Sequence, residues 1–476
     1  MQITNNNILS ERYVTPEMND LFSPRGKVLR MRELWIAVMK GQRELGLDIP
    51  SEQIERFEKA KTDINLERIR EIELQRRHDI KANIEAFVEA AGAGEYLHQG
   101  MTARDLTENV EQMQMRDAGR IIFGKYVAVL KNLLDKAEEY KHIVLTARTH
   151  HQPAQPILLG RRFSMWIQEL LFHLDGFETF LEKYPLRGIK GPVGTQSDML
   201  RLLRSEEKVD ALEQKVMQHL GFSRVLLATG QVYPRSLDYA FLNRLAEIAS
   251  PLQSFALTMR LMAGYDLVTE GFQEGQVGST AMPHKMNTRN AERICGFANM
   301  LKMYADGASR IAGDQWEEGD VSCSLPRRIL TVDPFYASDG LTETALTVLQ
   351  EMGHYPVIIS REVDRYIGFI ASTQFLMEAV KAGLGREEAH EIIKRVTISE
   401  ALRMRQGFEP AVTQRLAENE RFRDVGILQQ QLDAILADQQ QFLGNAARQI
   451  QQVALQAAPL LARYQDQARY RPGKIL

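Results

Sequence analysis

The sequence predicts an all-α protein, and three observations support this. None of the 16 prolines falls between Pro50 and Pro153 or between Pro356 and Pro410, so two long stretches lack the residue that most strongly breaks helices. Apolar residues recur at steps of three and four, the period of a buried helix face. Few segments alternate at period two, as strands do. We therefore expect strands to be rare and peripheral.

Three stretches are expected to form bundle helices, in chain order. The first, residues 126–144, carries one apolar seam typical of packed helices. The second, residues 237–268, is apolar on more than one face, as expected of a helix with neighbours on all sides, and Pro251 predicts a kink in it. The third, residues 292–311, gathers its apolar side chains on one side. The seam residues are Tyr126, Leu130, Leu133, Ala137, Tyr140 and Val144 in the first stretch, and Phe297, Met300, Leu301, Tyr304, Ala308 and Ile311 in the third.

Length and composition limit the class of protein. A chain of 476 residues exceeds one compact core and fits about three domains. The end of the chain from Leu428 is rich in glutamine but keeps helical spacing, which predicts a surface helical region. Lys plus Arg total 59 and Asp plus Glu total 62, a formal charge of −3. This balance argues against a nucleic-acid or membrane-surface protein, so neither is expected as a partner.

The cysteines and the N-terminus indicate an intracellular setting. Cys295 and Cys323, the two cysteines of the chain, cannot form a disulfide framework or a four-thiolate zinc site, and they suit a reducing compartment. The N-terminal residues lack the basic-then-apolar pattern of a signal peptide. The longest apolar run, residues 34–39, is six residues long, far short of a membrane span. We expect a cytoplasmic protein.

Prolines and glycines punctuate four loop segments, the longest of which is residues 271–287. Its glycines permit close approach of the backbone to a ligand, and Ser279, Lys285 and Asn287 supply hydroxyl, cationic and amide groups. The phosphate-loop pattern G-x-x-x-x-G-K-[ST] is absent. Local chemistry leaves two interpretations open, a structural loop and an anion-binding lid. The other three segments are residues 149–156, 186–195 and 230–235.

Three shorter groups are ambiguous when considered alone. His150 and His151 are adjacent and lack the H-E-x-x-H spacing of a metal site, so His150 is either a surface or structural histidine or a functional one. Residues 77–79 (Arg-His-Asp) are expected in a charge-rich helix with a solvated face. Residues 12–13 pair an arginine fork, which suits phosphate, with a phenol. Serine-nucleophile and dinucleotide motifs, G-x-S-x-G and G-x-G-x-x-G, are missing.

The combination of motifs is more informative. GSTAMPHKMN resembles the signature G-S-x-x-M-P-x-K-x-N of the fumarase/aspartase superfamily of lyases, and RTHHQPAQP resembles its T-H-x-Q-x-A-Q segment. SERYVTPEM near the N-terminus, RRHDIKA at 76–82 and TGQVYPRSLD at 229–238 are similar to adenylosuccinate lyases in particular. HQGMTARDLTEN at 98–109 and QWEEGDVSCSLPRR at 315–328 extend the likeness through about residue 400.

This resemblance implies a fold, a reaction and an assembly. The family fold has three mostly helical domains, expected here at residues 1–101, 102–354 and 355–476, and the middle domain supplies a long bundle that tetramerises. The reaction is elimination of fumarate from adenylosuccinate to give AMP, and from succinyl-aminoimidazole-carboxamide ribotide in purine synthesis. The partners implied are purine nucleotide substrates and a homotetramer with shared active sites. The chemistry requires no metal and no organic cofactor.

The resemblance also assigns roles to residues. Ser279 matches the base and His150 the acid, while Lys285 and Asn287 match positions that hold a substrate carboxylate and the developing carbanion. Such charge needs preorganised donors and cations. The remaining matches are the succinyl-side Thr102, Ala103 and Thr149, the nucleotide-side Arg12, Tyr13, Arg77, His78 and Asp79, and the further substrate contacts Gln231, Arg293, Ser324 and Arg328.

Departures from the family pattern bear on substrate contacts. Many relatives have Thr-Ser where this chain has Thr102-Ala103, which removes a hydroxyl donor but keeps the backbone N–H. Some adenylosuccinate lyases carry an arginine where this chain has Gly319, and Met286 and Thr288 replace residues of a common Arg-Asn-Pro pattern. Two other interpretations stay open from sequence: another lyase of the superfamily, such as argininosuccinate lyase or a carboxymuconate cycloisomerase, and a catalytically silent helical scaffold.

Overall fold

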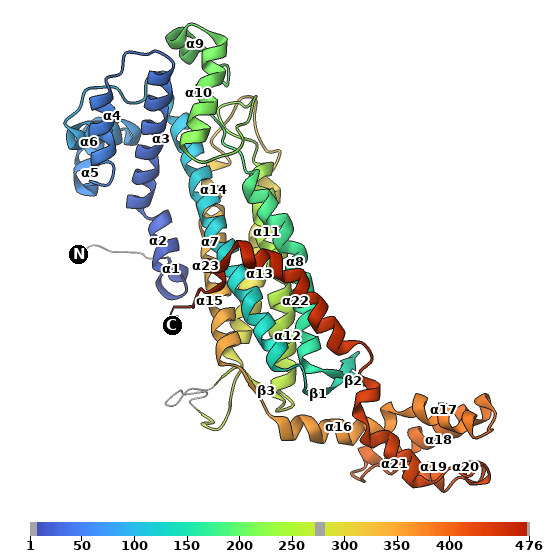
Figure 1. Cartoon of the computed structure of the whole chain (residues 1–476). Coiled ribbons are helices and arrows are strands. Elements are labelled where there is room, and N and C mark those ends of the chain that lie inside the picture. The colour runs from blue at the N-terminus through green and yellow to red at the C-terminus, as the bar shows by residue number, and fades with distance from the viewer. Residues whose placement is uncertain (1–6, 272–280, 474–476) are drawn as a thin grey trace.

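The protein is mostly helical, as the proline distribution predicts. The structure, a computed structural model, describes residues 7–271 and 281–473. In Figure 1 the N-terminal helices lie beside the upper part of a long bundle, and a group of shorter helices lies at the opposite end. The N-terminal helices are α1 (Ile8–Arg12), α2 (Pro16–Phe22), α3 (Pro24–Glu44), α4 (Ser51–Ala60), α5 (Leu66–Arg76) and α6 (Asp79–Ala91).

Long helices run up and down the bundle, and short ones join them. The longest, α7 (Ala103–Glu139), has 37 residues and so extends about 55 Å. Two short antiparallel ladders lie at the lower end of the bundle in Figure 1. The other elements of this part are β1 (Val144–Thr149), β2 (Gln152–Leu158), α8 (Leu159–Glu182), α9 (Ser197–Leu203), α10 (Glu206–His219), α11 (Ser236–Ile248), α12 (Ser250–Ala263), β3 (Val268–Thr269), α13 (Arg289–Ile311), α14 (Ser324–Leu330), α15 (Asp333–Glu351) and β4 (Gly353–His354).

The last part of the chain leaves the bundle and then returns to it. Residues 363–442 build a hydrophobic core of their own, whereas buried residues of α22 join the main core. The expected surface helical region is therefore helical, but α22 also packs on the bundle. The division into three domains stays a prediction. The elements are α16 (Pro356–Ile370), α17 (Ser372–Lys381), α18 (Arg386–Arg405), α19 (Val412–Ala417), α20 (Glu420–Asp424), α21 (Gln429–Ala437), η1 (Gln439–Phe442), α22 (Ala446–Arg463) and α23 (Gln465–Ala468).

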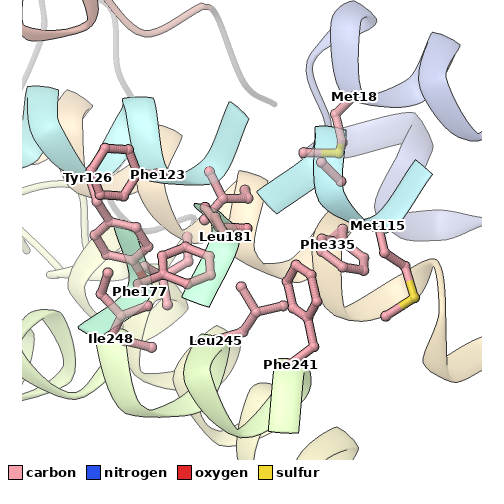
Figure 2. Close-up of a cluster of buried hydrophobic side chains, with 14 of the residues drawn as sticks. Met18, Met115, Phe123, Tyr126, Phe177, Leu181, Phe241, Leu245, Ile248 and Phe335 are labelled. Atoms are coloured by element: carbon pink, nitrogen blue, oxygen red, sulfur yellow. The ribbon is translucent and has the colours of Figure 1, made fainter. Parts of the chain in front are cut away.

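The main core follows α7, α8, α11 and α15. Aromatic and aliphatic side chains from these helices, together with Met18 of α2, pack in the cluster of Figure 2. The apolar seam predicted on the first stretch is buried from Tyr126 to Tyr140. Val144 departs from it, because α7 ends at Glu139 and Val144 begins β1. The labelled residues of the cluster are Met18, Met115, Phe123, Tyr126, Phe177, Leu181, Phe241, Leu245, Ile248 and Phe335.

The second predicted stretch is two helices rather than one kinked helix. α11 ends at Ile248 and α12 begins at Ser250, with Pro251 in the first turn of α12. Proline has no N–H to donate and clashes with the preceding turn, so the helix stops instead of bending. Phe255 and Met259 are buried, whereas Leu257 and Leu261 are exposed, so α12 presents apolar residues on two faces. α13 buries Phe297, Leu301, Ala308 and Ile311, with Met300 and Tyr304 half-buried.

Candidate active site

His150 lies at the tip of a β-hairpin. Residues 149–156 were expected to be a loop, but β1 and β2 pair antiparallel with Thr149 opposite Gln152. His150 and His151 form the turn, with φ of 51° and 60°. Consecutive positive φ values characterise the type I′ turn that suits a two-residue hairpin, although Asn and Gly are its usual residues. Both histidines and Thr149 are exposed, so a strained turn presents the predicted acid outwards.

Contacts around the hairpin hold this turn in place. Arg148 donates from Nη1 to the carbonyl of His151 at 3.1 Å and forms an ion pair with Glu362 on α16. Its guanidinium also lies 4.4 Å from the ring centre of Tyr265, and the His151 ring packs against the same tyrosine. The main-chain direction at His150 is thus fixed from both sides of the turn.

The predicted base lies outside the described residues. Ser279 belongs to residues 272–280, of which the structure describes nothing, but both flanks are described. Glu270 joins these flanks, because its carboxylate accepts the N–H groups of Asn290 at 3.0 Å and Ala291 at 2.9 Å. Burial raises the pKa of Glu270, and the two N–H donors oppose that rise. A buried carboxylate therefore ties the residue before Gly271 to the start of α13.

Lys285 and Asn287 lie on the C-terminal flank of this segment. Lys285 is exposed, and its N–H donates to the carbonyl of Met282 at 3.0 Å, which closes a turn. Asn287 is half-buried. Both precede α13 at the end of the bundle where β1, β2 and β3 lie in Figure 1. The predicted acid and the two predicted carboxylate-binding residues therefore belong to the same end of the molecule.

Tyr13 and Arg293 come together along the bundle. Tyr13, the C-cap of α1, packs edge-on against Phe297 with ring centres 5.2 Å apart. The Arg293 guanidinium lies 5.3 Å from the centre of the Tyr13 ring and donates to Asn290. Arg12 precedes Tyr13 and is exposed. An aromatic ring from the N-terminal part of the chain therefore meets the first turns of α13, with the exposed Arg12 next to it in sequence.

A second group of predicted residues gathers at the N-terminus of α7. Thr102 is the N-cap, and its Oγ1 accepts the N–H of Arg104 at 3.2 Å. Its own N–H donates to Asp105 at 2.8 Å, which completes a capping box. Ala103 is the first residue of the helix. Asp105 is fully buried and also accepts hydrogen bonds from Arg187 and from the N–H groups of residues 190 and 191. One carboxylate therefore aligns the start of α7 with the loop at residues 186–195.

Ser324, Arg328 and Gln231 belong to this same end. Arg104 Nη2 donates to Ser324 Oγ at 3.2 Å, and Arg104 also pairs with the buried Glu108. Arg328 follows on α14 and is exposed. The N–H of Gln231 donates to the carbonyl of Glu318 at 2.6 Å.

Gly319 has a φ of 149°, a conformation that side-chain-bearing residues rarely adopt. A Cβ at Gly319 would lie 3.2 Å from Gln231 Cβ. This turn is therefore built for glycine.

Residues 77–79 lie at the junction between α5 and α6, where Asp79 begins α6, and not within one continuous helix, which corrects the expectation. Arg77 ends α5 with φ of 54°, and His78 caps α6. A left-handed residue at the end of α5 breaks the helical run. Arg77 and Asp79 line a groove of about 900 Å³ between α3, α5 and α6, together with Lys27 and Arg70. The side chains of residues 77–79 are exposed. The cations of the groove, Lys27, Arg70 and Arg77, suit an anionic ligand.

One chain does not bring all the predicted residues together. Thr102 lies at one end of α7, and the hairpin with His150 follows the other end. The two are separated by a helix of about 55 Å. Within one chain there are four groups: His150 and Thr149 with Lys285 and Asn287; Thr102 and Ala103 with Gln231, Ser324 and Arg328; Arg12 and Tyr13 with Arg293; and the 77–79 junction.

Sequence reasoning overlooked the residues that organise these groups. Asp105 holds Thr102, Arg104 holds Ser324, and Glu270 joins the flanks of the segment at residues 271–287. The T-x-x-D spacing of Thr102 and Asp105 is a capping-box signal that identifies the first of them. Long-range partners such as Glu270 and Ala291 leave no local pattern.

Within the described ranges, no helix is both long and apolar enough to cross a membrane. Among the same residues, no group of three or more His, Cys, Asp and Glu side chains is arranged to hold a metal ion.

Known proteins resemble this chain along nearly its whole length. A family model described as "Lyase" matches residues 16–300, and one described as "Adenylosuccinate lyase C-terminus" matches residues 368–453. The adenylosuccinate lyase of Saccharomyces cerevisiae is 34% identical over 450 residues, covering 93% of this chain and 92% of its own length. That of Schistosoma mansoni is 31% identical over 455 residues, covering 94% and 93%.

A solved structure shares the fold. The 3-carboxy-cis,cis-muconate lactonizing enzyme from Pseudomonas putida superposes with a TM-score of 0.81 at 18% identity, covering 97% of this chain and 100% of that one. Its low identity limits this likeness to the architecture. The two family models and the relatives above 30% identity carry the classification: this chain belongs to the adenylosuccinate lyase family within the lyase superfamily.

Proposed function

We propose that the adenylosuccinate lyase activity of this chain eliminates fumarate from adenylosuccinate to give AMP, and from succinyl-aminoimidazole-carboxamide ribotide, by general acid/base chemistry. The matches to both family models and to full-length adenylosuccinate lyases support this proposal. The reaction removes a proton from the carbon next to a carboxylate and breaks a C–N bond. The charge that builds up needs fixed donors and cations, and the leaving nitrogen needs a proton.

Ser279 is proposed as the base and His150 as the acid. The exposed turn supports the role of His150 as the acid. Arg148 fixes the main chain of this turn through the His151 carbonyl, while the imidazole of His150 remains accessible. Lys285 supplies a cation in the sequence region of Ser279, and Asn287 supplies an amide. Together they hold a carboxylate of the substrate and the developing carbanion. Three further groups are proposed to donate hydrogen bonds to the succinyl carboxylates: the hydroxyls of Thr102 and Thr149 and the backbone N–H of Ala103.

The nucleotide side is proposed to involve the cationic residues. Arg77, Arg70 and Lys27 line one groove. Arg293 lies over the ring of Tyr13, whose neighbour in the chain is the exposed Arg12. Guanidinium forks match phosphate geometry, so Arg12 and Arg77 are expected to contact the phosphate. Gln231, Ser324 and Arg328 add further contacts.

We also propose a homotetramer whose sites combine residues of different subunits. The distance along α7 between Thr102 and the His150 hairpin supports this, because one chain cannot bring both to one substrate. The exposed apolar residues Leu257, Leu261 and Met303 on α12 and α13 support it as well, since such faces are costly in water and favour burial between subunits.

The decisive experiment follows fumarate release by absorbance. We expect the wild-type chain to cleave both substrates, and His150→Gln and Ser279→Ala each to abolish turnover while the assembly stays folded by light scattering and circular dichroism. His142→Gln, an exposed histidine just before β1, is the matched control and retains activity. Near-normal turnover by either site variant would overturn its assigned role, and a silent wild-type chain would restore the scaffold interpretation.

A further inference from the structure

A buried charge cluster joins α7 to α15. Lys125 of α7 faces Asp339 and Glu343 of α15, with exposed fractions of 3%, 0% and 0%. Lys125 Nζ forms an ion pair with Asp339 and lies 2.8 Å from Glu343 Oε1. One cation against two carboxylates leaves an excess negative charge in the core. Such a charge is tolerated only where further donors satisfy the oxygens.

Those donors come from the two ends of the chain. Thr15 donates to Asp339 Oδ2 from its N–H at 2.7 Å and its hydroxyl at 2.8 Å. Tyr470 donates its hydroxyl to Glu343 Oε1 at 2.6 Å, and the N–H of Gly473 donates to Glu343 Oε2 at 2.7 Å. The Tyr470 ring centre also lies 5.2 Å from Lys125 Nζ. Each carboxylate is therefore completed by a different end of the chain.

The N-terminal partner of the cluster is close to the nucleotide-side residues. Thr15 follows Tyr13 by two residues. Beside Asp339, Gly340 approaches Tyr13 so closely that an added Cβ would lie 2.9 Å from Tyr13 Cβ and 2.8 Å from Phe297 Cζ. The position of Asp339 on α15 thus sets where residues 12–15 lie, and Thr15 fastens them there.

The C-terminal partner is packed just as closely. Tyr464 packs edge-on against Phe123 with ring centres 5.0 Å apart, and its hydroxyl donates to Glu178 at 2.7 Å. A Cβ at Gly124 would lie 3.0 Å from Gln467 Cγ, so α7 is closely covered at the residue before Lys125. The segment from 464 to 473 is a docked part of the bundle.

We propose that Tyr470 is a positioning residue for the substrate site, which acts through Glu343, Lys125 and Asp339 to hold Thr15 and thereby Arg12 and Tyr13. The proposal rests on the proposed nucleotide-side role of Arg12 and Tyr13. Without the Tyr470 hydroxyl, Glu343 draws Lys125 away from Asp339, and Asp339 holds Thr15 less well. Binding of the nucleotide weakens, while the proton transfers, which belong to other residues, are unaffected.

The test compares two tyrosines of the same segment. Tyr470→Phe removes the hydroxyl on Glu343 but keeps the ring over Lys125, and Tyr464→Phe removes an equivalent hydrogen bond to Glu178 that does not touch the cluster. We expect Tyr470→Phe to raise KM for adenylosuccinate about five- to tenfold with kcat within about twofold. Tyr464→Phe leaves KM within about twofold. Equal KM values in the two variants would overturn the proposal.

A second pair of variants changes a single donor at the end of the segment. Gly473→Pro removes the N–H that Glu343 accepts, whereas Gly473→Ala keeps it, and an alanine Cβ there would lie 3.8 Å from Glu343 Oε2. The proline variant is expected to raise KM several-fold more than the alanine variant. The same KM for both would count against the role of Glu343.

Hydrogen exchange separates this proposal from the proposed function. In Tyr470→Phe, amides of residues 8–15 are expected to exchange about tenfold faster than in the wild type and in Tyr464→Phe. Unchanged exchange would refute the coupling between the chain ends. If exchange rises but KM does not, the positioning role fails. If Arg12→Ala also leaves KM unchanged, the nucleotide-side assignment fails instead.

Discussion

At the scale of single residues, the turn at His150 and His151 makes a strong prediction. His151 has a φ of 60°, which asparagine tolerates and a β-branched residue does not. His151→Val is expected to destabilise the hairpin by about 1–2 kcal/mol and to lower kcat, because the same turn carries His150. His151→Asn is the control: it loses the same ring contact with Tyr265 but tolerates the positive φ, so stability and kcat are expected to fall less than in His151→Val. Thermal unfolding and fumarate release measure the two effects, and a fully active valine variant would show that the turn is not strained.

Asp105 is a second residue whose replacement has a defined effect. Its buried carboxylate accepts from Arg187 and three backbone N–H groups. Asp105→Asn keeps the shape but leaves Arg187 without its counter-charge, so we expect a loss of about 3–5 kcal/mol in the free energy of unfolding. Asp198→Asn, at an exposed position on α9, is expected to change it by less than about 0.5 kcal/mol. Denaturant unfolding distinguishes them.

At the scale of elements, Glu270 joins β3 to α13 across the segment that contains Ser279. Glu270→Gln replaces one acceptor oxygen by an amide donor, which then faces the N–H group of either Asn290 or Ala291. We expect kcat to fall while the helices stay intact by circular dichroism. Glu292→Gln, an exposed carboxylate in the first turn of α13, leaves kcat unchanged. A Glu270 variant with wild-type kcat would contradict this.

The same residue predicts a pH dependence. Burial raises the pKa of the Glu270 carboxyl above its ordinary value of 4.5, so the native state holds this proton more tightly than the unfolded chain does. The difference in unfolding free energy between the wild type and Glu270→Gln is therefore greatest below the pKa that Glu270 has in the unfolded chain. It declines as pH rises through the raised pKa that Glu270 has in the native protein. Unfolding free energies of both proteins across this range provide the measurement, and a difference that grows with pH would contradict the assignment.

The helices could be predicted from sequence and the hairpin could not. Proline-free stretches and apolar steps of three and four located α7 and α13. Pro153 and Pro156 suggested a loop at β2, but in a two-stranded ladder every strand is an edge, where a missing N–H is tolerated. The break at residues 77–79 depends on a left-handed Arg77 that has no sequence signature. The motifs singled out His150 and Thr102 as candidate site residues, whereas their separation along α7 emerged only from the fold.

At the scale of the whole molecule, shared sites predict complementation between inactive chains. His150→Gln and Arg328→Ala alter opposite ends of the bundle, and each alone is expected to lose most activity. If a site takes these residues from different subunits, mixed tetramers regain activity in about a quarter of their sites. Co-refolding the two variants and measuring fumarate release tests this. Each variant refolded alone is the control, and a mixture no more active than its components would contradict shared sites.

The length of α7 also has a consequence for how this chain can vary. The 37 residues of α7 determine the distance between the hairpin that carries His150 and the capping box at Thr102. Removing a turn would shorten that spacing by about 5 Å and rotate every downstream side chain unless α8, α13 and α15 lost a turn as well. Insertions and deletions among homologues are therefore expected to accumulate in the connections and in the helices between residues 356 and 442, while the helical lengths of the bundle change together or not at all.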